Sequence, residues 1–312
     1  MKKVLLIIGL SVLTVGLAIG GYGFYIYKSM QSAVDSMHQP IDRTKSDKRE
    51  VAVDIDSQEP LAFLLMGVDE RGADKGRTDT IIVITVNPEE ESMKMVSIPR
   101  DTYTEIVGRG TMDKINHAYA FGGPEMAINT VENFFDIPLD YFVTINMEGF
   151  KEIVDVLGGV SVESEMAFSY GGYDFDEGIL ELDGEAALAY SRMRYEDPRG
   201  DLGRNDRQRQ IIDAIIKEGA QFSTITKADD ILDSLGKNVA TNLTFDEMMK
   251  IQSNYAKARH NSETLEFSGN GGGKKDGIWY LFVPEEEREH VSHELRVHLG
   301  IEDSSEVAAA EE

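Results

Sequence analysis

Two acidic residues and several arginines surround the ends of three predicted strands near the start of the main domain. The strands are predicted from apolar or β-branched runs at residues 61–66, 80–86 and 93–98. If the strands are neighbours that run up, down and up, Asp69, Asp79 and Arg100 meet at one sheet edge. Arg71 and Arg77 lie in the loop between the first two strands. Paired carboxylates beside arginines suit magnesium bridging to a phosphate. An exposed turn with ordinary salt bridges is the alternative.

A second basic group consists of Arg192 and Arg194, which are separated by one methionine. In an extended segment alternate side chains share a face, so the two guanidinium groups are expected to point the same way. Arginine forks match phosphate oxygens in a bidentate manner, which favours a phosphate ligand here. The alternative is an edge strand with two charges on its solvated side.

A helix that begins near Arg204 places polar and apolar residues on one stripe. At 100° per residue the stripe consists of Arg204, Gln208, Ile211 and Ile215, with Arg207 beside it. Its apolar half must face the core, so the polar half is expected to point inward as well. Buried guanidinium groups are costly without an anion, and a phosphate at a helix N-terminus also gains from the helix dipole. The stripe therefore predicts an inward-facing anion site.

The alternative for this helix is that its arginines pair with nearby acids, Asp197 or Asp201. Such pairs explain part of the charge, but six of the 15 arginines of this acidic chain fall within residues 192–209. Asp206 and Arg209 lie on the far side of the helix and are expected to face solvent.

The composition excludes several classes of function. A net charge of −25 argues against nucleic acid as a general partner, because phosphate backbones need a basic face. The chain has no cysteine and no Gly-x-Ser-x-Gly turn, so an acyl-enzyme is not indicated. The glycine-rich segment 269–275 lacks the spacing of a phosphate-binding loop and is interpreted as a hairpin tip. His290, His293 and His298 have no zinc-ligand spacing.

The N-terminal segment predicts a membrane anchor. Residues 4–27 carry no charge, and as a helix they are about 36 Å long, enough to cross the hydrocarbon core of a bilayer. Lys2 and Lys3 place the short N-terminal side in the cytoplasm. A cleaved signal peptide is the alternative, but its apolar region is usually only about 7–15 residues long. Tyr22 and Phe24, with neighbouring tyrosines, resemble an interfacial aromatic belt.

The remaining chain is expected to form one extracellular α/β domain, a central mixed β-sheet flanked by helices. We predict a cytoplasmic tip (1–3), a transmembrane helix (4–27), a polar stalk (28–57), the domain (58–302) and a disordered tail (303–312). Helices are expected near residues 124–135, 150–157, 184–190, 205–218, 245–258 and 285–299. Further strands are expected at residues 141–147 and 160–163, with a hairpin-like pair at 264–267 and 278–283.

Taken together, the charged motifs resemble the catalytic domain of the LytR-CpsA-Psr family. The matching segments lie in order at residues 66–69, 77–80, 97–101, 114–119, 122–123, 182–186, 192–194 and 201–208. The resemblance spans roughly residues 58–225, and the remainder to about residue 300 looks like the family's closing segment. The chain is most similar to the family's wall teichoic acid transferases of Gram-positive bacteria. Several independent motifs in the right order are more specific than one short pattern.

The resemblance implies a phosphotransferase in cell wall biogenesis. The implied donor is a polyprenyl-pyrophosphate-linked glycopolymer, such as teichoic acid, and the implied acceptor is the muramic acid C6 hydroxyl of peptidoglycan, with polyprenyl phosphate released. It implies Mg²⁺ held by Asp69 and Asp79. The implied pyrophosphate-binding residues are Arg77, Arg100, Lys114, Arg192, Arg194, Arg204, Arg207 and Gln208. Arg194 is the expected catalytic arginine, and Asp201 is a candidate base or orienting residue.

The resemblance leaves the lipid site and two other functions open. The polyprenyl tail needs an apolar groove, for which Phe121, Phe134 and Phe135 are candidates. A lipid-pyrophosphate hydrolase would use the same phosphate site with water as the acceptor. A non-catalytic, wall-associated binding or regulatory protein is the third possibility. In each case the expected location is the cell membrane, with one transmembrane pass and the domain outside.

Overall fold

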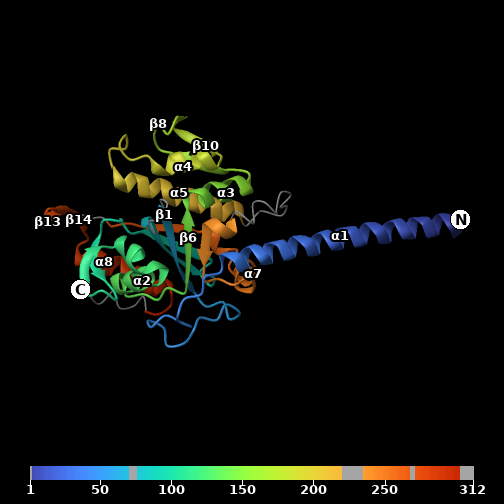
Figure 1. Ribbon diagram of the computed structural model, residues 1–312, viewed down its shortest axis with the longest axis horizontal. Coiled ribbons are helices and arrows are strands. Elements are labelled where there is room, and N and C mark those ends of the chain that lie inside the picture. The colour runs from blue at the N-terminus through green and yellow to red at the C-terminus, as the bar shows by residue number, and fades with distance from the viewer. Residues whose placement is uncertain (1, 70–75, 220–234, 268–270, 303–312) are drawn as a thin grey trace.

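A six-stranded mixed sheet forms the centre of the molecule (Figure 1). The computed structural model describes residues 2–69, 76–219, 235–267 and 271–302, and side chains only from residue 20 on. In spatial order the strands are β11 (Val239–Thr241), β6 (Tyr141–Asn146), β1 (Leu61–Asp69), β2 (Arg77–Asn87), β3 (Ser92–Ser97) and β12 (Ser262–Leu265). β2 runs antiparallel to both β1 and β3, as expected, whereas β6 runs parallel to β1 and β12 parallel to β3. The α/β architecture with a mixed sheet is confirmed.

Two helices fill one face of this sheet with a dense core. They are α2 (His117–Phe135) and α8 (Glu285–His298), and α2 is kinked at Gly122 and Gly123, ahead of its internal proline. Leu64 and Met66 of β1 are fully buried there, against Phe135 of α2. Side chains alternate along a strand, so Phe63 and Leu65 point to the opposite face. β1 is therefore apolar on both sides, as in strands that are covered on both faces.

A smaller lobe lies beyond the carboxyl end of β1 and β6 (Figure 1). It contains α3 (Met147–Leu157), β7 (Val160–Ser164), β8 (Phe168–Tyr170), β9 (Tyr173–Phe175), β10 (Gly178–Leu182) and α4 (Gly184–Arg192). The long helix α5 (Asp201–Gly219) packs Ile211 and Ala214 into the core of this lobe. Ile212 and Ile216 of the same helix face the central sheet. Helix α5 therefore lies between the lobe and the sheet.

The C-terminal hairpin differs from the prediction. Residues 262–265 form strand β12 of the central sheet, and β14 (Ile278–Phe282) pairs instead with the glycine-rich β13 (Gly271–Lys275). The glycines were interpreted as a flexible tip, but strand pairing uses backbone groups and needs no side chains. A second small hairpin, β4 (Tyr103–Ile106) with β5 (Thr111–Lys114), lies next to β14. The remaining elements are α7 (Phe245–Asn254) and the short η1 (Ala258–His260).

The N-terminal segment forms one helix, α1 (Lys2–Met37), which projects away from the body (Figure 1). In the part of the chain whose side chains are described, we find no helix long and apolar enough to cross a membrane. The predicted anchor at residues 4–27 falls mostly outside that part, and the predicted tail at residues 303–312 lies wholly outside the described residues. Both stay predictions.

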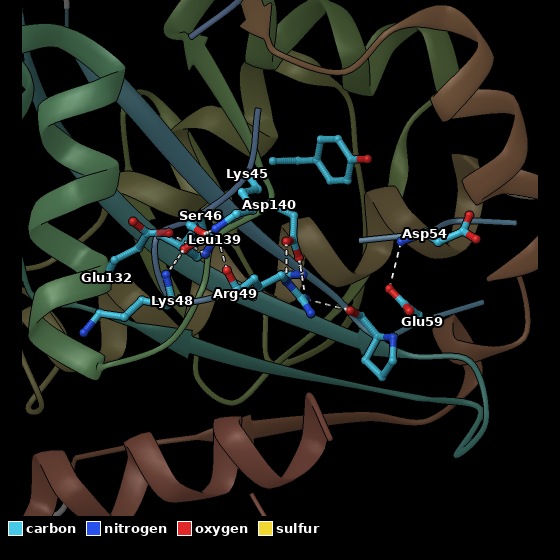
Figure 2. Close-up of polar contacts among 12 residues, drawn as sticks. Lys45, Ser46, Lys48, Arg49, Asp54, Glu59, Glu132, Leu139 and Asp140 are labelled. Atoms are coloured by element: carbon cyan, nitrogen blue, oxygen red, sulfur yellow. Dashed lines mark hydrogen bonds and ion pairs between the residues drawn. The ribbon is translucent and has the colours of Figure 1, made fainter. Parts of the chain in front are cut away.

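Part of the segment predicted as a polar stalk, residues 28–57, is in contact with the body. Residues up to Met37 continue α1, and the following segment is held on the body by buried ion pairs. Arg49 donates to both carboxylate oxygens of Asp140, at 2.7 and 2.9 Å, and Figure 2 shows the two side chains facing each other. Arg43 pairs with Glu132 at 2.6 Å. The mixed charges of this segment are typical of a solvated linker. The acidic partners of Arg43 and Arg49 lie about 90 positions further along the chain, so these ion pairs are not visible in the local sequence.

Candidate active site

A cavity of about 860 Å³ separates the central sheet from α5. Most of its wall is apolar and comes from β1, β2, β6, α3, α5 and α7: Phe63, Leu65, Ile84, Val86, Val143, Ile145, Phe150, Ile153, Ile212, Ile215, Ile216 and Ile251. One end is charged, and we call it the mouth. The mouth is lined by Asp69, Asp79, Arg100, Arg192, Arg194, Arg204 and Gln208. An apolar cavity with convergent polar groups at one end suits an amphiphilic ligand.

A β-bulge turns Asp79 into the mouth. Gly67 pairs with Thr80 and Val68 with Thr78, which leaves Asp79 as the extra residue on β2. By strict alternation Asp79 would share a face with Ile81 and point into the packed core. Because of the bulge, Asp79 and Thr80 both line the cavity although they are adjacent in sequence. The sequence predicted that Asp69, Asp79 and Arg100 meet at one sheet edge, and the structure places all three in this mouth.

The mouth gathers positive charge that its own acids only partly balance. Arg100 donates to Asp79 at 2.8 Å, and Arg204 contacts Asp201 at 3.0 Å. Burial lowers the pKa of Arg204, and so does repulsion from Arg100 and Arg194, while Asp201 and Asp79 oppose this change. Arginine remains protonated even so. Among the described residues, the Nε of Arg204 is buried without a hydrogen-bond partner. The mouth is therefore suited to an anion with several oxygen acceptors.

Asp201, the first residue of α5, ties two of these arginines together. Its Oδ1 lies 3.0 Å from the Arg204 guanidinium and 3.3 Å from Arg194 Nε. Asp201 does not itself line the cavity. This geometry fits an orienting residue that holds the guanidinium groups toward the mouth, whereas a role as general base stays a prediction.

The helical stripe is placed much as expected. Arg204, Gln208 and Ile215 line the cavity, but the fully buried Ile211 turns into the smaller lobe and Ile212 takes its place on the cavity wall. The structure also separates Arg207 from the mouth. It is buried, donates to Asp197 at 2.7 Å and to the Met193 carbonyl at 2.7 Å, and is outside the cavity lining. The pairing considered as the alternative therefore applies to Arg207.

Three further basic residues have other surroundings than predicted. Arg209, which was expected to face solvent, is buried. Its guanidinium group pairs with Asp206 on the same helix and with Glu266, at 2.5 Å, outside that helix. Lys114 pairs with Asp101 at 2.6 Å and is outside the cavity lining. Arg77 is exposed at the start of β2 and stands opposite Asp69 in the strand pairing. Lys114 and Arg77 therefore flank the mouth from neighbouring positions.

The three phenylalanines suggested for a lipid groove do not line the cavity. Phe134 and Phe135 are buried in the packed core with Phe267, on the opposite face of the sheet, and Phe121 is exposed beside Arg109. The residues of the cavity wall were not predicted from the sequence, because Val143, Ile145 and the isoleucines of α5 have the same pattern as ordinary core residues. A second apolar face on strands whose first face is already covered was the available signal.

The two carboxylates of the mouth form a sparse set of metal ligands. In the described part of the chain no group of three or more acidic, histidine or cysteine side chains could hold a metal ion. Magnesium is commonly bound by one or two carboxylates together with substrate phosphates and water. Asp69 and Asp79 line the same mouth as the arginines and fit that arrangement. A structural metal cage does not fit.

Comparison with known proteins agrees with this geometry. The sequence profile of the LytR_cpsA_psr family matches residues 24–297. The chain is 58% identical over 302 residues to the polyisoprenyl-teichoic acid–peptidoglycan teichoic acid transferase TagU of Halalkalibacterium halodurans, covering 96% of this chain and 99% of that protein.

Two solved structures share the fold. The crystal structure of Bacillus subtilis TagU is similar with a TM-score of 0.62 and 50% identity, over 77% of this chain and 97% of that one. The LytR-CPS2A-psr family protein YwtF (TagT), solved with bound octaprenyl pyrophosphate lipid, is similar with a TM-score of 0.68 and 28% identity. That match covers 84% of this chain and 100% of the other.

Proposed function

The chain belongs to the LytR-CpsA-Psr family, and from this membership we propose that it transfers a glycopolymer from a polyprenyl-pyrophosphate carrier to peptidoglycan. The observation that carries the proposal is the junction of an apolar cavity of about 860 Å³ with an arginine-rich mouth. A polyprenyl pyrophosphate has the same two parts, a long apolar chain and a doubly phosphorylated head. A related structure holds such a lipid, and close relatives are named teichoic acid transferases.

The two parts of the cavity divide the work of binding. The isoleucines of α5 and the strand residues opposite them surround the tail, and each buried methylene contributes about 0.8 kcal/mol. Arg100, Arg194 and Arg204 bind the pyrophosphate oxygens at the mouth. The tail thereby fixes where the phosphates lie relative to the guanidinium groups, which is the positioning that phosphoryl transfer mainly requires.

In the transfer step, an acceptor hydroxyl oxygen forms a bond to the phosphorus that carries the polymer. The bond from that phosphorus to the bridging oxygen breaks, and polyprenyl phosphate leaves with the electron pair. The proton of the acceptor hydroxyl is released to solvent or taken up by the departing phosphate. The arginines stabilise the charge that spreads over the transferred group, and Asp201 keeps Arg194 and Arg204 aimed at it. No covalent enzyme intermediate is required.

We further propose that Mg²⁺ takes part, held by Asp69 and Asp79 together with the substrate phosphates. A bound magnesium ion would neutralise phosphate charge and polarise the phosphoryl oxygens. Treatment with EDTA followed by Mg²⁺ addition tests this proposal in the purified enzyme. Turnover that is unchanged in EDTA would exclude an essential metal.

The single-pass anchor at residues 4–27 is also a proposal. Its support is that the uncharged segment lies within one continuous helix, α1. The chain that follows α1, residues 38–60, is held on the body by ion pairs such as that of Arg49 with Asp140. Exposed Tyr22, Phe24, Tyr25 and Tyr27 near the end of that segment are suited to a membrane interface. An anchor there would keep the domain at the surface where a membrane-embedded donor resides.

The decisive test separates transfer from hydrolysis. Purified full-length protein in detergent is given a synthetic polyprenyl-pyrophosphate disaccharide and soluble peptidoglycan strands. A transferase leaves phosphodiester-linked saccharide on the strands and releases polyprenyl phosphate. Release of free saccharide phosphate with unmodified strands would identify a hydrolase, and no consumption of the donor would identify a binding protein.

A further inference from the structure

The hairpin of β13 and β14 presents the chain's only tryptophan to solvent. Trp279 is 43% exposed. Ile278 and Phe282 are 51% and 37% exposed, but side chains alternate along a strand, so these two lie on the opposite face of the hairpin from Trp279. An aromatic side chain as large as tryptophan is normally well buried, so its exposure on this hairpin is unusual. The transfer mechanism uses none of these three side chains.

The glycines of β13 leave room for one ring on each face of the hairpin. A Cβ atom on Gly272 would lie 2.2 Å from a ring atom of Trp279, and one on Gly273 would lie 3.3 Å from the ring of Phe282. The tryptophan therefore rests on a stretch of backbone that has no side chains. This support fixes the ring and leaves much of it open to solvent. A preplaced aromatic ring loses little conformational entropy when a ligand stacks on it.

The hairpin is joined directly to the loop that forms the mouth. Leu281 of β14 donates its backbone N–H to the Asp101 carbonyl at 2.9 Å, and Tyr103 packs against Tyr280 with ring centroids 4.9 Å apart. Asp101 follows Arg100, which lines the cavity. The hairpin therefore contacts the loop that carries Arg100.

The position of the hairpin points away from the membrane. In Figure 1, drawn with the longest axis horizontal, β13 and β14 lie at one end and the N-terminus of α1 lies at the other. If α1 is the anchor, the hairpin faces the wall rather than the lipid surface. The exposed Lys274 and Lys275 of β13 make it locally less acidic than a chain of net charge −25 would suggest. An anionic wall polymer is therefore less strongly repelled there.

We propose that this hairpin docks the saccharide chain of the peptidoglycan acceptor, with Trp279 as the residue on which a sugar ring stacks. The inference rests on the proposed function and extends it to the acceptor. The C–H face of a pyranose packs on the electron-rich face of an indole, which suits a ring held flat and open on one side. Contact at Trp279 would guide a glycan strand along the hairpin toward the phosphate mouth.

The single tryptophan makes the first test direct. Intrinsic tryptophan fluorescence of the full-length protein in detergent is titrated with soluble, uncross-linked peptidoglycan strands. Stacking at Trp279 predicts a saturable change in intensity or emission maximum. If strands bind by sedimentation or calorimetry while the fluorescence stays constant, the ligand does not touch Trp279 and the inference is wrong.

Kinetics provide the second test. Trp279→Ala is expected to raise the KM for peptidoglycan strands by about fivefold to tenfold, the scale of one lost aromatic contact, with the KM for the lipid donor unchanged. Trp279→Phe should recover most of the loss, and Ile179→Ala, which truncates another exposed apolar side chain, should behave as wild type. An unchanged acceptor KM in Trp279→Ala would refute the inference, as would a shift in oligomeric state that identifies the face as a self-association surface.

These outcomes are separate from failure of the proposed function. Wild-type protein that consumes no donor would refute the transferase itself. Wild-type transfer with a normal acceptor KM in Trp279→Ala would refute only the docking surface. A melting temperature equal to that of wild type confirms that the hairpin variant is folded.

Discussion

The two faces of the central sheet have similar residues and opposite uses. Toward α2 and α8, Leu64 and Met66 are fully buried in a continuous core. Toward α5, Phe63 and Leu65 of the same strand line an open cavity. The difference comes from the covering helix, because α5 also packs into the smaller lobe and leaves space above the sheet. An apolar strand face is therefore not by itself a sign of a filled core.

Polar groups differ between the faces in the same way. On the packed face, His298 bridges the hydroxyls of Thr85 and Ser92 at 2.7 and 2.9 Å, so its ring nitrogens are satisfied within the fold. On the cavity face, Arg204 is held by Asp201 but keeps a buried Nε without a partner among the described residues. The His298 ring therefore needs no ligand, whereas the Arg204 guanidinium on the cavity face is suited to receive one.

Truncation of the packed face should have the largest effect. Phe135→Ala removes a fully buried ring and is expected to lower the free energy of unfolding by about 3–5 kcal/mol. A truncation on the cavity face, Ile216→Ala, removes a half-buried side chain and should cost less than about 2 kcal/mol, the lower limit for a buried isoleucine. Chemical denaturation of both variants measures the contrast. Equal losses would mean that the two faces are packed alike.

Loss of a mouth arginine should act on catalysis and not on folding. Arg194→Ala is expected to lower kcat by about 100- to 1,000-fold, the effect of removing one preorganised charge-stabilising donor. The side chain is 41% exposed, so the melting temperature should stay close to that of wild type. Transfer assays with the synthetic donor measure the rate, and wild-type turnover in this variant would be incompatible with the assigned mouth.

Substitution of a valine by phenylalanine on each face of the sheet tests which face has room for a larger side chain. Val143→Phe places a larger ring into the cavity and should change stability by less than about 1 kcal/mol while raising the donor KM. Val83→Phe puts the same ring into the packed core and should cost about 1–3 kcal/mol. Denaturation and donor titration are the two measurements. A Val143→Phe enzyme with normal donor KM would place the tail elsewhere.

The smallest expected effect is a pH dependence of the packed face. Burial lowers the pKa of His298 below its usual value of 6.5, and nearby Lys94 adds to this, while Glu90 opposes it. Below pH 6.5 the imidazole of His298 takes up a proton more readily in the unfolded chain than in the folded one. The contribution of His298 to the free energy of unfolding is therefore complete above pH 6.5 and declines as the pH falls below it. His298→Gln should weaken that decline in denaturation experiments at pH 7.5 and 5.5. The same slope in both proteins would assign it to other groups.

The sequence was sufficient for local chemistry and insufficient for long-range packing. Asp69, Asp79 and Arg100 could be brought together because tight connections restrict how three successive strands pair. The β-bulge that turns Asp79 toward the cavity has no recognisable pattern in the sequence. Arg209 was misplaced because Glu266, its partner, lies 57 positions away.

The same limit applies to the segment that follows α1. Arg49 and Asp140 are separated by 91 positions, so their ion pair could not be read from the local charge pattern. The cavity wall was missed for a related reason: Val143 and Ile145 differ from core residues only in what α5 leaves uncovered. Local periodicity indicates which face of a strand or helix a side chain lies on, but not which other element packs against that face.

A crystal structure of the protein with a polyprenyl pyrophosphate tests the central claim most directly. The account predicts density for the prenyl chain between β6 and α5, along Val143, Ile145 and Ile216, with the two phosphates against Arg194 and Arg204. Lipid density on the α2 and α8 face, or phosphates bound away from these arginines, would contradict it.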